Sequence, residues 1–210
     1  MRFHQPFDKI VDSEAKVRVL RFLCRKGGEW TGRGIAAGLG MNPVTAHRAL
    51  RGLHEATVLD FRKMGNNFLY SLRDEHYLTW RLLRPLFAAE AQVWGRLLEL
   101  LMKRVPARLK SKTLSVAVYG SVARGEERPT SDIDLFILVE SEQAKREILR
   151  SLERFPEIVE KEFGNSPALY VNTVREGQQK YRLPLFQNIL RCHELIWGRP
   201  LGELLRGRAA

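Results

Sequence analysis

The chain has 210 residues, of which 44% are hydrophobic and 28% are charged. This composition is typical of soluble globular proteins and excludes a disordered chain. Because no apolar run reaches the length of a membrane span and the N-terminus lacks the apolar core of a signal peptide, we expect a cytoplasmic protein with no membrane partner.

The net charge of +11 is confined to the first half of the chain. Residues 1–74 hold 13 Lys/Arg and 7 Asp/Glu, residues 75–112 hold 8 and 3, and residues 113–210 hold 14 of each. A basic half joined to a neutral half favours a polyanionic partner for the first. A generally basic surface would give the same total, so charge alone does not decide the partner.

Residues 12–55 carry three successive helix patterns separated by glycines. Asp12 or Ser13 is expected to cap the first helix, Thr31 to open the second, and Asn42 to cap the third with Pro43 in its first turn. The third helix is expected to bury four apolar side chains: Val44, Ala46, Leu50 and Leu53.

Two β-prone runs, VLDFRKM and NFLYSL, follow on either side of Gly65-Asn66, which predicts a hairpin. Three helices and a hairpin form the winged helix-turn-helix layout. The stretch TGRGIAAGLGMNPVTAHRALRGLHEATVLDFRKMGNNFLYSL resembles winged-helix transcriptional regulators of the ArsR/MarR-like kind, over residues 10–73. We therefore expect residues 1–74 to form a winged helix-turn-helix domain that binds double-stranded DNA.

The polar side of the third helix and the hairpin tip provide the candidate DNA contacts. Arginine and threonine near a helix N-terminus suit base edges and phosphates in the major groove, and basic residues at a hairpin tip suit the backbone or minor groove. An alternative is that the arginines only solvate a helix face, and winged helices also bind proteins. The candidate DNA-binding residues are Asn42, Thr45, His47, Arg48, Arg51, Arg62 and Lys63.

Residues 75–112 are helical in pattern and are expected to form a helical linker or a dimerisation segment. Pro85 is expected to start a fresh helix. An apolar stripe at helical spacing is a candidate homodimer seam, although an intramolecular packing face explains it as well: Leu86, Ala89, Val93, Leu97 and Leu101.

From residue 113 the pattern changes to strand, turn, strand, helix, strand and helix. LSVAVY, DIDLFILVE and PALYVNTV are the expected strands, residues 142–155 an amphipathic helix, and residues 177–197 a helix interrupted at Pro184. Residues 113–210 are therefore expected to form a separate α+β domain.

Asp132 and Asp134 are placed two residues apart in the second of these strands, so their side chains project from the same side. Two adjacent carboxylates repel each other unless a cation lies between them, and Mg²⁺ prefers such oxygen ligands. Gly120-Ser121, after the first strand, offers close backbone approach, free N–H groups and a hydroxyl to an anion, and Arg124 lies one turn further on. These parts predict a metal-dependent phosphoryl or nucleotidyl transfer site.

The stretch GSVARGEERPTSDIDL resembles the signature of the minimal nucleotidyltransferases in the DNA polymerase β superfamily. The resemblance covers residues 113–200 and implies a mixed, antiparallel-rich sheet flanked by helices. It also implies a nucleoside triphosphate, ATP above all, and Mg²⁺ as ligands. By motif position, Gly120 and Ser121 would hold the triphosphate, and Asp132 and Asp134 would be the catalytic metal ligands. Active members resemble a three-carboxylate scheme, whereas the strand ALYVNTV has no acid; Asn172 is the nearest polar residue and Glu176 a possible substitute.

Two functions follow from this departure. One is a transcriptional regulator whose second domain binds Mg-NTP with weak or lost transfer activity. The alternative is an active nucleotidyltransferase whose winged helix regulates its own operon. Because minimal nucleotidyltransferases also resemble antitoxins that modify a HEPN-type toxin, that alternative includes a HEPN-type protein partner.

Overall fold

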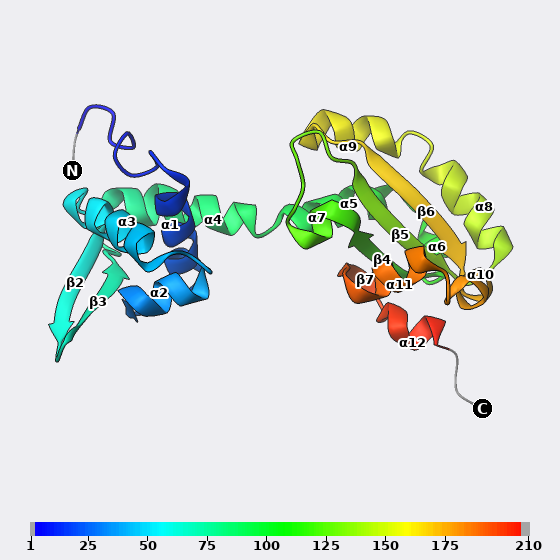
Figure 1. Ribbon diagram of the computed structural model, residues 1–210. Helices are drawn as coiled ribbons and strands as arrows, with labels where there is room; N and C mark the ends of the chain where they lie inside the picture. The colour runs from blue at the N-terminus through cyan, green and yellow to red at the C-terminus, as the bar shows by residue number, and fades with distance from the viewer. Residues whose placement is uncertain (1–2, 207–210) are drawn as a thin grey trace. The chain divides into compact units, whose positions relative to one another are not determined.

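The computed structural model describes residues 3–206, and the chain divides into two compact units, Met1–Gln92 and Val93–Ala210 (Figure 1). Each unit has its own hydrophobic core, and the second unit has one on each face of its sheet. Helices and sheets occur together in both units, as the predicted α+β class requires. None of the helices within residues 3–206 has the length and apolar character that a membrane crossing needs.

The first unit consists of short helices around a small sheet. In chain order its elements are α1 (Glu14–Lys26), β1 (Trp30–Thr31), α2 (Gly32–Gly38), α3 (Pro43–Glu55), β2 (Leu59–Met64), β3 (Asn67–Leu72), a π-helical turn η1 (Thr79–Leu83) and α4 (Arg84–Glu90).

Side-chain caps start the first three helices where the sequence predicts them. The Ser13 hydroxyl accepts the N–H of Lys16 at 3.4 Å before α1. The Thr31 hydroxyl accepts the N–H of Gly34 at 3.0 Å, and the side-chain Oδ1 of Asn42 accepts the N–H of Val44 at 2.9 Å. Each cap gives a partner to a backbone N–H group that the helix itself leaves unpaired.

Helix α3 buries a different set of side chains from the one expected. Ala46, Ala49, Leu50 and Leu53 form its buried face, whereas Val44 is 59% exposed. Val44 precedes Ala46 by two residues, which is about 200° around the helix, so the two side chains cannot share a face. The expectation that Val44 belongs to the core is therefore wrong, and Ala49 takes its place.

The hairpin of the first unit has the predicted turn. Strands β2 and β3 pair antiparallel with Met64 opposite Asn67, and Gly65 has a φ of 58°, which a two-residue turn requires. Strand β1 pairs with β3 on the other side, so the three strands lie in the order β1-β3-β2.

The segment 75–112, expected as a helical linker or dimerisation segment, is divided between the two units instead. Leu83 and Phe87 pack in the core of the first unit, while Leu97 and Leu101 pack in that of the second. The chain turns at residues 91–92, so the stripe from Leu86 to Leu101 does not form one continuous helix face. Burial of apolar side chains on both sides of this turn outweighs a continuous helix.

The second unit alternates strands with helices. In chain order its elements are α5 (Val93–Arg104), α6 (Ala107–Lys110), β4 (Thr113–Tyr119), α7 (Gly120–Arg124), β5 (Ile133–Val139), α8 (Glu142–Ser151), α9 (Phe155–Phe163), β6 (Pro167–Thr173), α10 (Val174–Lys180), α11 (Pro184–Arg191), β7 (Glu194–Gly198) and α12 (Leu201–Leu205).

The sheet of the second unit is mixed, as predicted, with the order β6-β5-β4-β7. Strand β5 pairs antiparallel with β4 and parallel with β6, and β7 pairs antiparallel with β4. Apolar side chains of α5, α8 and α9 pack on one face, and those of α11 and α12 on the other (Figure 1). The three layers fix the N-terminal end of β5 beside the C-terminal end of β4.

The helix expected over residues 177–197 is interrupted more than the sequence indicates. Helices α10 and α11 cover residues 174–180 and 184–191, and residues 194–198 form the edge strand β7. The short run ELIWG does not distinguish a helix end from a strand. Pairing with β4 makes it a strand, with Trp197 opposite Val116.

We expect the two apolar residues on opposite sides of α3 to differ sharply in their effect on stability. Leu50→Ala leaves a cavity in a fully buried position and should lower the free energy of unfolding by about 2–5 kcal/mol. Val44→Ala should change it by less than about 0.5 kcal/mol. Urea dependence of amide hydrogen exchange in residues 14–72 measures both; equal losses would contradict the burial assigned to α3.

Candidate functional site

The turn from β4 into α7 brings backbone against a carboxylate. Gly120 follows the last residue of β4 and has a φ of +76°, a conformation that side-chain-bearing residues rarely adopt. A Cβ atom at this position would collide with the Asp134 carboxylate. Both the backbone angle and the lack of space therefore require glycine here.

Asp134 lies in β5 directly opposite Tyr119 and is half-buried, while Asp132 is exposed just before the strand begins. Burial, and then the negative charge of Asp132, raise the pKa of Asp134, and the Arg124 guanidinium partly opposes the shift. The ionised form of Asp134 is therefore disfavoured until a positive charge arrives. The two aspartates that the motif predicts are thus close enough to interact.

Ser121 and Arg124 lie in the short helix α7, on the same turn as Gly120. Ser121 is half-buried and Arg124 is exposed. The Arg124 side chain donates its Nε–H to Glu126 at 2.7 Å, and this carboxylate raises the pKa of Arg124. The sequence predicts that Arg124 contacts a phosphate. Because the guanidinium is bound to Glu126, it would have to exchange this carboxylate for the phosphate.

Three aromatic side chains pack against one another on the sheet of the second unit. Phe136, Tyr170 and Phe186 contact one another edge to face, with ring centroids 5.6 to 5.9 Å apart. Tyr119 lies beside them, and burial and the nearby Asp134 raise its pKa. Tyr170 therefore packs against the core of the second unit. Its place in one of the strands expected from the sequence is consistent with this role.

The two polar residues considered as replacements for a third carboxylate have other partners. Asn172 pairs with Leu138, which lies four residues along β5 from Asp134. The side-chain Oδ1 of Asn172 accepts a hydrogen bond from Lys180 Nζ at 3.0 Å. Four residues of strand correspond to about 13 Å. Asn172 is therefore not near the two aspartates, which corrects the sequence expectation.

Glu176 is equally committed. Its carboxylate accepts hydrogen bonds from Lys145 Nζ at 2.6 Å and from the Thr173 N–H at 2.8 Å, which completes a capping box at the start of α10. Lys145 and the cap lower the pKa of Glu176 against the effect of burial. The carboxylate starts a helix and does not face Asp134, so its use as the third acid is wrong.

The residues present fit a single hard cation. Asp132 and Asp134 offer carboxylate oxygens at the start of β5, and Asp134 lies against Gly120. Within residues 3–206, no group of three or more His, Cys, Asp and Glu side chains is placed to hold a metal ion. The oxygen ligands suit Mg²⁺, and the rest of its shell would come from water or phosphate oxygens.

The candidate DNA contacts of the first unit are all exposed. Thr45, His47, Arg48 and Arg51 lie on the outer side of α3, and Arg62 and Lys63 lie on β2 near the hairpin turn. Asn42 uses its side-chain oxygen to cap α3, which leaves its amide N–H₂ group for another partner.

Two of these arginines form ion pairs. Arg51 donates to Glu55 one turn away in α3 at 2.9 Å. Arg62 donates to Glu29, 33 residues earlier in the chain, at 2.6 Å, and this hydrogen bond lowers the pKa of Glu29. Both pairs are exposed, and such pairs contribute little to stability, so exchange of either carboxylate for a phosphate costs little.

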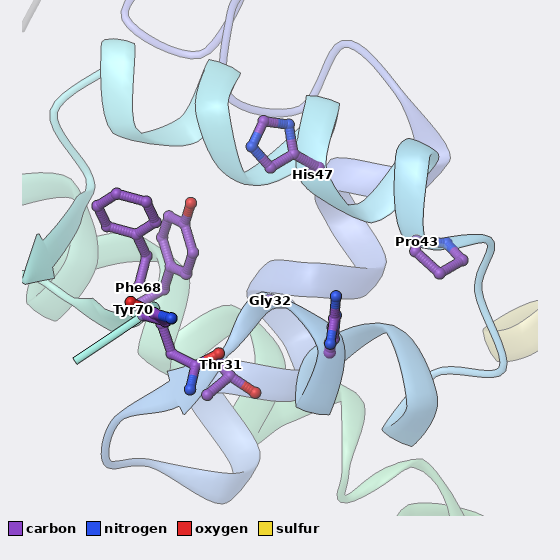
Figure 2. Close-up of a pocket in the computed structure, with 9 residues that line it drawn as sticks. Thr31, Gly32, Pro43, His47, Phe68 and Tyr70 are labelled. Carbon is purple, nitrogen blue, oxygen red and sulfur yellow. The ribbon is translucent and has the colours of Figure 1, made fainter. Parts of the chain in front are cut away.

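A cavity of about 540 Å³ lies between the start of α2, the start of α3 and the hairpin (Figure 2). His47 projects from α3 toward the cavity, and Phe68 and Tyr70 stand side by side on the hairpin. Its lining contains no carboxylate residue: Thr31, Gly32, Arg33, Pro43, His47, Asn66, Asn67, Phe68 and Tyr70. Sequence reasoning missed Arg33, Asn66 and Asn67, although Arg33 lies in the first turn of a predicted helix and Asn66 in a predicted turn.

Comparison with known proteins gives one family match and two partial structural similarities. The crystal structure of the AntR antimony-specific transcriptional repressor is 23% identical, covers 41% of this chain and 76% of its own, and has a TM-score of 0.36. The crystal structure of a toxin-antitoxin with AMP-PNP is 17% identical, covers 51% of this chain and 74% of its own, and has a TM-score of 0.34. With TM-scores this low, neither similarity bears on function. No curated protein matches the chain.

The family match falls on the second unit. Residues 98–189 match the model of the nucleotidyltransferase domain, a range that contains Gly120, Asp132, Asp134 and the strands β4, β5 and β6. The match coincides with the residues that the geometry brings together, so residues 98–189 of this chain are similar to the nucleotidyltransferase domain.

Proposed function

We propose that the protein is a DNA-binding transcriptional regulator whose nucleotidyltransferase domain binds a nucleoside triphosphate, ATP above all, together with Mg²⁺. The observation that carries this proposal is the contact between Gly120 and Asp134, with Asp132 near enough to raise the pKa of Asp134. A cation between the two carboxylates removes their repulsion, and the triphosphate completes the shell of that cation.

Each residue of the nucleotide site has a role in this proposal. Asp132 and Asp134 hold Mg²⁺, while the backbone N–H groups of Gly120 and Ser121 and the Ser121 hydroxyl bind phosphate oxygens. Arg124 leaves Glu126 and pairs with a phosphate, for which its planar guanidinium is suited. When bound, Mg²⁺ would offset part of the negative charge of the phosphates.

The first unit supports the DNA-binding part of the proposal by its topology and its charge. The order helix, strand, helix, helix and hairpin, with β1 added beside β3, agrees with a winged helix-turn-helix. Helix α3 presents exposed polar and basic side chains, and the cavity next to it has Arg33 and His47 but no carboxylate. A duplex placed against α3 and the hairpin would contact both.

The first test is the loss of the half-buried carboxylate. Asp134→Asn should weaken Mg²⁺-dependent ATP binding at least about tenfold, measured by calorimetry. Burial and the Asp132 charge raise the pKa of Asp134, so the protonated form stabilises the fold and this stabilisation is lost as pH rises through that pKa. At pH 7 without Mg²⁺ the asparagine variant, which carries no charge, should therefore unfold at a higher temperature than wild type.

Glu153→Gln removes an exposed acid between α8 and α9 and is the matched control, expected to change neither quantity. Unchanged ATP affinity in Asp134→Asn would reject the cation site.

Substitution of two glycines distinguishes the effect of backbone strain from the effect of a steric clash at the site. Gly120 and Gly125 both have positive φ, at +76° and +66°, but only a Cβ at Gly120 meets the Asp134 carboxylate. Gly120→Ala should therefore abolish ATP binding in calorimetry, whereas Gly125→Ala should lose stability through strain but keep the affinity of the folded protein within about threefold. Equal ATP affinities in the two variants would contradict the steric requirement for glycine at position 120.

The DNA interface is tested by the salt dependence of binding to a random-sequence duplex in fluorescence anisotropy. The logarithm of the binding constant should fall linearly with the logarithm of salt, by about 0.9 per neutralised phosphate. Arg48→Ala/Arg51→Ala should reduce this slope by up to about 2. Arg146→Ala/Arg150→Ala removes the same charge from exposed positions of α8 and should leave the slope unchanged; equal effects would indicate net charge rather than α3.

The alternative function is active nucleotidyl transfer to a protein such as a HEPN-type toxin, with the first unit regulating the operon. The intact motif and the family match over residues 98–189 favour it. Incubation with α-labelled ATP, Mg²⁺ and lysate distinguishes the two functions. Label on a protein that disappears with Asp132→Asn supports transfer, and Mg²⁺-dependent binding without label supports the regulator.

A further inference from the structure

The strand next to Asp134 determines how many cations the site can hold. Strand β6 runs parallel to β5, and the register places Ala168 directly beside Asp134. Paired residues on neighbouring strands have their side chains on the same side of the sheet. Ala168 is exposed, so it lies on the open surface next to the carboxylate. Its methyl group brings no oxygen to the place nearest to Asp134.

The other neighbours of Asp134 do not bring a third carboxylate either. On the opposite side, β4 contributes Tyr119 in register with Asp134 and then Gly120. Further along β6 on the same side come Tyr170, which packs on Phe136 and Phe186, and Asn172, which is bound by Lys180. Within residues 3–206, no third His, Cys, Asp or Glu side chain joins Asp132 and Asp134 in a group that could hold a metal ion.

Two carboxylates are enough for one divalent cation that also binds phosphate oxygens and water. A pair of cations about 3.5–4 Å apart needs further anionic oxygens, because the two positive charges repel each other. On the proposed function, we infer that the site holds a single divalent cation with the bound triphosphate. We further infer that Ala168 occupies a position, directly beside Asp134, from which a third carboxylate would hold a second cation.

A site with a single cation can bind a nucleotide but lacks groups that nucleotidyl transfer needs. One cation held by Asp132 and Asp134 would offset part of the triphosphate charge and would keep the phosphates beside the turn at Gly120. No carboxylate remains to hold a second cation at an acceptor oxygen or to accept the proton of an attacking hydroxyl group. The nucleotide therefore stays intact while it is bound, which suits a ligand-binding domain.

The test counts cations on the full-length protein. Mn²⁺, which electron paramagnetic resonance detects directly, is titrated with a non-hydrolysable ATP analogue into wild type, Ala168→Asp and Ala168→Asn. Wild type should bind about one Mn²⁺ per bound nucleotide, and Ala168→Asp should bind about two, with spin coupling between them. Ala168→Asn has the shape of aspartate without its charge and should bind about one.

The outcomes separate this inference from the proposed function. Two Mn²⁺ ions in wild type, or one in Ala168→Asp with nucleotide still bound, would overturn the inference and leave the nucleotide site standing. Wild type that binds neither nucleotide nor Mn²⁺ would remove the proposed function and the inference with it. Because Ala168 is exposed, the variants should fold, and a thermal unfolding midpoint within a few degrees of wild type checks this.

Discussion

The second unit is organised around one unfavourable arrangement, a half-buried carboxylate held against a backbone turn beside a second carboxylate. Burial and the Asp132 charge both disfavour the ionised form of Asp134, and its carboxylate occupies the space that a Cβ atom at position 120 would need. The cores on the two faces of the sheet hold the strands that carry these groups. Packing thus maintains a local charge arrangement that a cation would relieve, which is common at functional sites.

Much of the fold could be predicted from the sequence because its signals are local. The caps at Ser13, Thr31 and Asn42 and the turn at Gly65 depend on residues within a few positions of each other. The strand β7 could not be predicted, because its five residues satisfy a helix or a strand pattern equally. Its strand conformation depends on β4, about eighty residues earlier.

The candidate site shows the same division between local and distant information. The spacing of Gly120, Asp132 and Asp134 is readable in the sequence, and so is the absence of an acid in the strand that became β6. What the sequence does not contain is the register, because residues 168, 170 and 172 share one side of β6 and only pairing with β5 tells which lies beside Asp134. A polar residue on the correct side, Asn172, was therefore a reasonable candidate and is about 13 Å too far along the strand.

In the first unit, the exposed ion pair between Arg62 and Glu29 also depends on distant parts of the chain, because the two residues are 33 positions apart. It ties β2 to the turn that precedes β1, so it orients a basic side chain of the hairpin relative to α2 and α3. As an exposed pair it adds little to stability, and a phosphate group competes well for the same guanidinium. The ion pair with Glu29 thus holds the Arg62 side chain in place, and it does not prevent Arg62 from binding a polyanion. Its position, and not its lack of a partner, is what makes it a candidate contact.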